Sequence, residues 1–510
     1  MVVLKASITG GNRKIKSSAF LPVFLLLCVH SISICAGVNE GTLIIGIGRN
    51  FYEGPESATF LHGSTRTWEA LVDLDSDFRP VPWLAQSWSH NRDYTEWKFT
   101  LRKNVRFHNG DLLTADHVIA NIKRLKLNPK YDPLDRYGIV EKLYALDDLN
   151  ILFLLKRSCL NFPQLISYYG SPILHPGGWD AEGKIKRFIA TGPYRLVEVR
   201  KIWEESIVLE RNDRYWGRIP PYARVIFRSI PDPHARLNAL LAGTIDAILD
   251  VGGILPHQKK VLIRSPGIAV KTSRVATTHY LIPNNRAYPF SNEKFRRWFA
   301  SSVDRELVVE TIMEGHGRVA YDPYSDLNCR WSFSSVSFRA VPFPEEEVLP
   351  QIDKPVLILL HAGTVQRWPY REIAEYVASI LRSKGLKTEI FVAEKALYFA
   401  LLKDGSYNLT IMPFTLMTGD PCLFYSAFLY SKGIRNTGWK CPCVDMLIDR
   451  ANATKSVSEK RVIYRNLQKL IATHALIIPL FHEETLYAYR KSSGAIGMDA
   501  LFRPFYEEGA

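Results

Sequence analysis

The sequence predicts a protein of the α/β class that is divided into several lobes. Its 510 residues are 47% hydrophobic and 12% aromatic, which is enough to bury roughly two or three separate cores. An apolar run at residues 355–361 predicts a buried strand, the amphipathic pattern at 370–381 predicts a helix, and 387–392 predicts a second strand. This β-α-β alternation is typical of parallel strands. Residues 407–414 predict a third strand, whose C-terminal end we expect at a ligand cleft.

The most strongly patterned stretch is residues 83–125. Trp97, Phe99 and Leu101 alternate with polar residues, which predicts a strand with one buried face. An Asn-Gly turn follows, and Thr114 is a suitable N-cap for a helix. The apolar stripe of that helix consists of Val118, Ile119, Ile122 and Leu125.

The remaining elements follow from the same two periodicities. Apolar runs predict strands at 42–48, 151–155, 207–210, 226–230 and 477–482. Amphipathic patterns predict helices at 234–242, from about 295, at 444–448 and at 461–472. Gly243 is a suitable C-cap for the first of these helices.

The net charge of +14 does not indicate nucleic-acid binding. Lysines and arginines are spread along the chain, and no basic helix or aromatic-spaced basic stripe stands out. We therefore expect no nucleic-acid partner.

Residues 1–36 resemble a secretory signal peptide. Four basic residues precede an apolar run at 19–29, and Ala36 closes a small-residue cleavage site. The run is shorter than the about 20 residues that a membrane span needs, which favours a secretory signal over the alternative of an uncleaved anchor. A lipid anchor on Cys35 is less favoured, because Ile34 stands where a small residue is usual. We expect a periplasmic protein that is soluble after cleavage.

The mature chain would keep five cysteines, namely Cys159, Cys329, Cys422, Cys441 and Cys443. An odd number implies at least one free thiol or an intermolecular bond. We expect a disulfide from Cys422 to Cys441 or Cys443, which would close a loop of about 20 residues. The Cys-Pro-Cys spacing does not indicate zinc, because no second paired set of ligands exists.

Motifs for catalysis or metal binding are missing from the sequence. There is no nucleophile elbow and no P-loop. His474 and His482 are eight residues apart across a proline-containing strand, which is not a metal-ligand spacing. We therefore expect no enzyme activity, no cofactor and no metal site.

Several motifs together carry a family resemblance. Residues 83–88 and 97–118 follow the pattern PWLAxSW, WxFTLRxxVxFxNGxxxTAxxV, and similar matches occur at 191–196, 207–217, 231–247 and 418–424. In this order they resemble the extracytoplasmic solute-binding proteins, family 5, of peptide- and nickel-importing ABC transporters. Residues 68–80 also resemble a helix-to-turn passage of that family.

The resemblance implies a bilobal periplasmic binding protein fold of the cluster C type, with three discontinuous parts joined by hinge strands. Lobe I would comprise residues 40–68, 190–290 and 485–510, lobe II 69–189, and lobe III 291–484. It also implies a monomer that captures a peptide or small organic solute and delivers it to an ABC permease and its ATPase.

The ligand contacts that the resemblance implies are Tyr52, His62, Tyr169, Phe414, Met417 and Asp420. Tyr52 and His62 lie in the first loop, and ordinary loop packing is the alternative for both. Met417 stands where dipeptide-binding relatives carry an acidic residue for the peptide amine, and Cys422 stands where nickel-binding relatives carry a histidine. Asp420 could hold an ammonium group or cap the following helix.

Other interpretations are a nickel or metal-chelate receptor, and a secreted enzyme or periplasmic sensor on the same scaffold. The missing histidine disfavours the nickel receptor, as do tyrosines at 168–169 where nickel-binding relatives carry arginines. The hydrophobic signal occupies the place where a transcription-factor-type sensor would have its DNA-binding domain.

Overall fold

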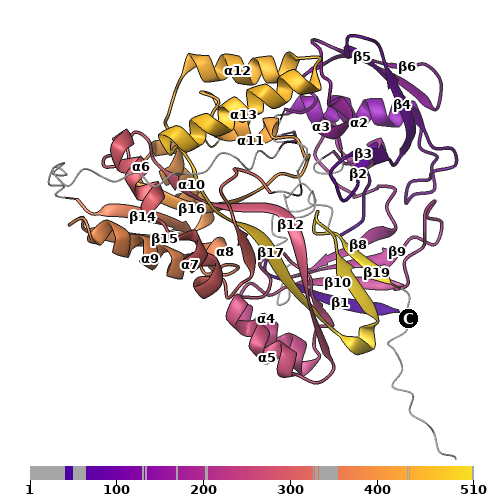
Figure 1. Ribbon diagram of the computed structural model, residues 1–510. Coiled ribbons are helices and arrows are strands. Elements are labelled where there is room, and N and C mark those ends of the chain that lie inside the picture. Colours follow the sequence, from indigo (N-terminus) through magenta and orange to yellow (C-terminus); the bar gives the residue numbers. More distant parts are fainter. Residues whose placement is uncertain are drawn as a thin grey trace, which may run out of the picture. The chain divides into compact units, whose positions relative to one another are not determined.

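The computed structural model is built around a mixed sheet of eleven strands (Figure 1). The structure describes residues 41–49, 65–128, 131–132, 135–167, 171–200, 205–325, 327, 331, 354–433, 435 and 437–507. These residues all belong to one compact unit, Asn39–Ala510. In spatial order the sheet runs β15 (Thr388–Ala393), β14 (Val356–His361), β16 (Leu409–Thr415), β12 (Ile268–Pro283), β17 (Ile478–Arg490), β11 (Ala247–Ile248), β1 (Thr42–Ile47), β10 (Arg224–Ser229), β9 (Ser206–Arg211) and β8 (Tyr194–Arg200), and β13 (Gly317–Val319) pairs with β17.

Two long antiparallel strands, β12 and β17, join the two groups of strands within this sheet (Figure 1). β12 pairs with β16 through its second half, Thr277 to Pro283. β17 pairs with β11 near its far end, at Ala488 and Tyr489. The strands of residues 356–415 therefore connect to those of residues 42–248 through β12 and β17 in the described sheet.

The predicted β-α-β unit is confirmed. β14 and β15 are parallel, and α9 (Tyr370–Arg382) lies between them in the chain with its apolar face buried. β16 pairs with β14 in parallel as the predicted third strand. α8 (Ala362–Val365) and α10 (Lys395–Asp404) complete this region.

A second, four-stranded antiparallel sheet comprises β4 (Ala85–His90), β5 (Glu96–Leu101), β7 (Asn150–Leu155) and β6 (Val140–Ala145). The alternation at Trp97, Phe99 and Leu101 is confirmed, since all three side chains are buried. α2 (Ala115–Leu127) begins after Thr114, whose hydroxyl hydrogen-bonds Nδ1 of His117 at 2.7 Å. The predicted apolar stripe of α2 packs into the same hydrophobic core as this sheet. The short helix α3 (Phe162–Leu165) follows β7 in the chain.

The expected helix-to-turn passage at 68–80 is wrong. Residues 68–71 are not helical, and β2 (Val72–Leu74) pairs with β3 (Pro80–Pro82). The carbonyl of Glu69 accepts from the amide of Ile173, and the carbonyl of Ala70 accepts from Leu84. Partners distant in the sequence thus hold this backbone extended, and local helix propensity does not decide its structure.

The other predicted helices are present. The prolyl turn at Asp232 opens α4 (Pro233–Ala242), and Gly243 ends it in a left-handed conformation. The remaining helices are α5 (Lys259–Arg264), α6 (Glu293–Ser302), α7 (Arg305–Leu307), α11 (Cys422–Phe428), α12 (Pro442–Ala453) and α13 (Val457–His474), with short helical turns at Pro176–Gly178, Pro256–Gln258, Val308–Ile312 and Lys491–Ser493. A last hairpin pairs β18 (Ala495–Met498) with β19 (Pro504–Glu507).

Three larger hydrophobic cores lie within this framework. One spans the main sheet with α6 and α9, one lies under the second sheet with α2, and one lies between β12, β16 and the helices α11 to α13. Among the described residues, every helix is too short or too polar to cross a bilayer. The predicted signal at 1–36 lies outside the described residues.

Candidate functional site

The predicted ligand contacts that can be placed lie on one passage, from the end of β16 into α11. Gly419 makes the turn in this passage with a φ of +67°, and a Cβ there would lie 2.5 Å from Cβ of Phe78. Only glycine satisfies both the positive φ and this close approach. Tyr52, His62 and Tyr169 lie outside the described residues.

Phe414 and Met417 pack into different cores. The half-buried ring of Phe414 lies 5.7 Å from the ring of Phe424 and 5.3 Å from that of Phe428. The guanidinium of Arg435 lies 5.4 Å from the same ring. Met417 is buried in the core of the main sheet. Phe414 and Met417 are therefore close in the sequence, but their side chains pack against different neighbours.

Asp420 is buried and fully engaged by the protein itself. Its Oδ2 accepts from Nδ2 of Asn161 at 2.5 Å and from Nζ of Lys460 at 2.9 Å. Its Oδ1 accepts from the hydroxyl of Tyr464 and, at 2.8 Å, from the amide of Cys422. The last contact caps α11, as the sequence allowed. The carboxylate thus joins the loop before α3 to α11 and α13.

A cavity of about 330 Å³ lies beside this carboxylate, and we call it the interface cavity. Its walls include Arg136, Arg157, Cys159 and Asn161 from one stretch of the chain, and Asp420 and Cys422 from the other. Burial raises the pKa of the Cys159 thiol to about 11 and also raises the pKa of Cys422. Both thiols are therefore protonated at neutral pH, and neither is an activated nucleophile.

The predicted disulfide from Cys422 is wrong. Cys441 and Cys443 bond to each other across Pro442, with their Cα atoms 5.3 Å apart, and Cys422 is free. The Sγ of Cys422 contacts Asn452, near the end of α12, whereas Cys441 immediately precedes that helix. A twelve-residue helix is about 18 Å long, which places the predicted partners beyond disulfide reach.

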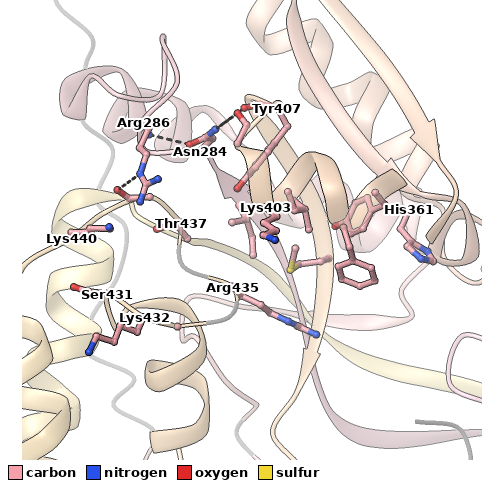
Figure 2. Close-up of a pocket in the computed structure, with 18 of the residues that line it drawn as sticks. Asn284, Arg286, His361, Lys403, Tyr407, Ser431, Lys432, Arg435, Thr437 and Lys440 are labelled. Atoms are coloured by element: carbon pink, nitrogen blue, oxygen red, sulfur yellow. Dashed lines mark hydrogen bonds between the residues drawn. The ribbon is translucent and has the colours of Figure 1, made fainter. Parts of the chain in front are cut away.

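A larger cavity, of about 530 Å³, is lined in part by Met412 and Pro413 of β16 (Figure 2). We call it the basic cavity, because its titratable Arg, Lys and His lining residues are Arg286, His361, Lys403, Lys432, Arg435 and Lys440. No aspartate or glutamate is among the described residues that line it. Lys403 comes from α10, whereas Arg435 and Lys440 come from the segment before α12 on the facing wall (Figure 2).

A buried polar network lies beside the two long strands. His279 of β12 contacts the carboxylate of Glu483 on β17 through Nε2 at 3.1 Å, and its Nδ1 lies 2.6 Å from the hydroxyl of Tyr370. Burial lowers the pKa of His279, so the neutral ring donates to Glu483 and accepts from Tyr370. Nearby, the buried Asp250 pairs with Arg49 at 2.6 Å.

The sequence analysis missed the residues that complete these sites. Asn161 and Lys460 hold Asp420, yet neither lies in a motif with it. Arg286, Lys403 and Lys440 meet only because β12, α10 and the segment before α12 are neighbours in space. Among the described residues, no three His, Cys, Asp or Glu side chains are arranged to hold a metal ion.

A family model covers most of the chain. The model of the bacterial extracellular solute-binding proteins, family 5, matches residues 79–436. The nickel-binding periplasmic protein of Escherichia coli is 23% identical over 466 residues, covering 86% of this chain and 87% of that relative. The dipeptide-binding protein of the same organism is 23% identical over 542 residues, covering 97% and 98%.

Solved structures share the fold. NikA from Brucella suis in complex with Fe(III)-EDTA is similar with a TM-score of 0.78 and 21% identity, covering 91% of this chain and 100% of that one. DppA from Helicobacter pylori in complex with the peptide STSA has a TM-score of 0.76 and 20% identity, covering 92% and 98%. The predicted bilobal periplasmic binding protein fold is thereby confirmed.

Proposed function

Because the chain belongs to the bacterial extracellular solute-binding proteins of family 5, we propose that it is the periplasmic receptor of an ABC importer for a peptide or similar small organic solute. It binds the solute between lobes and delivers it to the permease and ATPase without making or breaking a bond. The leader at 1–36 is removed on export, and the mature receptor is a monomer.

The observation that carries this proposal is the connection through β12 and β17. Two groups of strands are linked in the described sheet by these two long strands, which is an arrangement suited to hinge closure around a ligand. Lobe I would then be residues 40–68, 190–290 and 485–510, lobe II 69–189 and lobe III 291–484.

The ligand would contact Tyr52, His62, Tyr169, Phe414, Met417 and Asp420. Phe414 is the strongest of these, because its ring is half-buried and lies at the C-terminal end of β16. For Asp420 the engaged carboxylate favours the capping alternative over ligand contact.

A nickel or metal-chelate receptor is the second candidate. It is favoured by the likeness to a nickel-binding relative and to a binding protein solved with an iron chelate. Cys422 replaces the histidine that the resemblance would require, and its thiol is protonated because burial raises its pKa. A chelate would therefore have to be held by groups other than this side chain.

One experiment separates these candidates. The protein, secreted into an oxidising compartment and cleaved near Gly37, is analysed by native mass spectrometry, with metal analysis of the same sample. A co-purified mass of a few hundred daltons without nickel is the expected result. Stoichiometric nickel would instead support the chelate receptor. If the sample is empty, thermal-shift screening of peptide and chelate libraries follows, and no stabilisation by any peptide or organic solute would contradict the proposal.

A further inference from the structure

The disulfide between Cys441 and Cys443 is a feature that the proposed function does not use. We propose that it is a thiol–disulfide exchange site, which small thiols open and small disulfides close again while the protein stays folded. This inference goes beyond the proposed function, because exchange at these two sulfurs requires neither a bound solute nor closure of the lobes.

The first reason is that this disulfide ties no distant parts of the fold together. It joins two residues that are separated only by Pro442. The stabilisation that a disulfide gives by restricting the unfolded chain grows with the length of the loop it closes, and this loop is as short as the spacing allows. Backbone bonds already form the start of α12, because the amides of Val444 and Asp445 donate to the carbonyl of Cys441 at 2.9 and 3.2 Å. Opening the disulfide would therefore leave the fold in place.

The second reason is the difference in access between the two cysteines. Cys443 is exposed, as is Pro442 beside it. Cys441 is half-buried and packs against the core between β12, β16 and the helices α11 to α13. Exchange begins when a thiolate attacks one sulfur of the bond, and its rate depends on which sulfur can be reached. We therefore expect attack on Sγ of Cys443, with Cys441 as the leaving group.

The third reason is the position of that leaving group. Cys441 is the N-cap residue of α12, a helix of 12 residues. Negative charge is stabilised at this end of a helix, where N-cap side chains accept hydrogen bonds from amides of the first turn. Lys440 adds a neighbouring positive charge, whereas Asp445 in the first turn opposes it and accepts from the amide of Ser431 at 2.8 Å. A stabilised thiolate leaves faster, which favours opening of the bond toward Cys441.

The exchange partner has to come from solution. Cys159 and Cys422 are the free cysteines in the described part of the chain, and burial raises the pKa of both thiols. Cys422 contacts Asn452, near the far end of α12 from the disulfide. Neither thiol is therefore placed or ionised to attack the bond. The partner that fits is a thiol of low molecular weight.

The exchange takes place in two balanced steps. The thiolate of a first small thiol attacks Sγ of Cys443, a mixed disulfide forms there, and Cys441 leaves as a thiolate that takes a proton from water. A second small thiolate then attacks the small-molecule sulfur of the mixed disulfide and releases the thiolate of Cys443. Two small thiols are thereby oxidised to one disulfide, while the protein disulfide gains two electrons and two protons. The reverse sequence, with a small disulfide as the oxidant, closes the bond again.

Equilibration with glutathione followed by alkylation tests the inference. The folded protein is incubated with about 5 mM reduced and about 0.5 mM oxidised glutathione, trapped with iodoacetamide and digested, so that mass spectrometry assigns each alkylated cysteine. We expect at least about one molecule in ten to be alkylated on both Cys441 and Cys443, with the buried Cys159 unlabelled. A structural disulfide is about a thousandfold harder to reduce and would stay closed. A smaller labelled fraction in the folded protein would overturn the inference.

Two single variants identify the attacked sulfur. Cys441→Ser leaves the exposed thiol of Cys443, and Cys443→Ser leaves the half-buried thiol of Cys441. With oxidised glutathione, Cys441→Ser should take up one glutathione at least about tenfold faster than Cys443→Ser, because access limits the reaction. The control variant Cys159→Ser should exchange at Cys441 and Cys443 like the unmodified protein. Equal rates in the two single variants would overturn the proposed attack on Cys443.

The double variant Cys441→Ser, Cys443→Ser separates exchange from a structural role. Its melting temperature should lie within about 3 °C of that of the oxidised protein, because the bond closes so short a loop. The reduced protein should melt in the same range. A larger fall in either sample, or a double variant that fails to fold, would show that the disulfide is structural and would overturn the inference.

Discussion

The interface cavity and the basic cavity lie near the same strand, β16, but handle charge in opposite ways. Beside the first, Asp420 and Lys460 neutralise each other, and both are almost fully buried. In the second, three lysines remain exposed and have no partner among the described residues. A charge that is already neutralised within the fold is closed to a ligand, whereas an excess that is left open is accessible to one. The comparison therefore separates polar residues that are paired within the fold from those that are not, without reference to motifs.

The largest effect should come from breaking the buried pair. Asp420→Asn leaves the Lys460 ammonium, 1% exposed, without its counter-charge. Removing one partner of a buried ion pair costs about 3–5 kcal/mol, so the free energy of unfolding measured with urea should fall by that amount. The double variant Asp420→Asn, Lys460→Met should recover part of the loss.

An exposed pair supplies the control for this comparison. Nζ of Lys455 lies 2.5 Å from Oδ1 of Asp93, and the two side chains are 54% and 60% exposed. They join the turn between β4 and β5 to the segment before α13, whereas the buried pair joins the segment before α11 to α13 itself. Asp93→Asn should leave the urea midpoint nearly unchanged. An equal loss in Asp93→Asn and Asp420→Asn would contradict the distinction between buried and exposed pairs.

A smaller effect is expected for Phe414, which lies near the end of β16. Its ring is half-buried, so Phe414→Ala should lower the free energy of unfolding by about 2 kcal/mol, below the cost of a fully buried phenylalanine. If the ring also contacts the transported solute, affinity for the co-purified ligand should fall at least about tenfold. Phe414→Leu, which keeps most of the apolar volume, should recover stability but not affinity. Recovery of both would show that the ring serves packing alone.

The fold could largely be predicted from the sequence, because periodicity reports burial directly. The apolar runs at β14, β15 and β16 and the stripe of α9 required only local patterns. The structure at Glu69 could not be predicted this way. Its carboxylate accepts from Trp83, Tyr215 and Trp216, and the last two lie almost 150 residues away in the chain.

The candidate sites were less predictable for the same reason. The resemblance located the passage of Phe414, Met417 and Asp420, but it gave no sign that Lys460 would neutralise Asp420. The cysteine count and spacing likewise led to a predicted disulfide where the length of α12 keeps the cysteines apart. Partners that meet through tertiary structure leave no periodic signal along the chain.

The pH dependence of anion binding would sharpen the comparison further. Burial lowers the pKa of His361 below its usual value of 6.5, with Glu394 opposing and Arg367 reinforcing the shift. As pH falls from 7 through this pKa, the ring gains a charge that strengthens anion binding in the basic cavity. The same protonation is favoured in the unfolded chain, so folding stability falls over the same range. Titration with benzene-1,3-disulfonate, whose charge is constant, should show progressively tighter binding as the pH is lowered from 7 through the His361 pKa, and His361→Gln should remove most of that difference.

The smallest effect is expected from a single lysine of the basic cavity. Lys403→Gln removes one of several like charges and no hydrogen bond to the described residues, so the free energy of unfolding should change by less than about 0.5 kcal/mol. The sign of this change in the free energy of unfolding is informative. Relief of repulsion from Arg286 and Lys440 predicts a slight gain in stability at low salt, and this gain should disappear when salt screens the charges. Lys469→Gln on the exposed face of α13 should show no such salt-dependent gain. Urea unfolding of both variants at two ionic strengths measures the difference. A loss of stability in Lys403→Gln would mean that the lysine is neutralised within the fold, and the two cavities would then not differ in the way that their charges indicate.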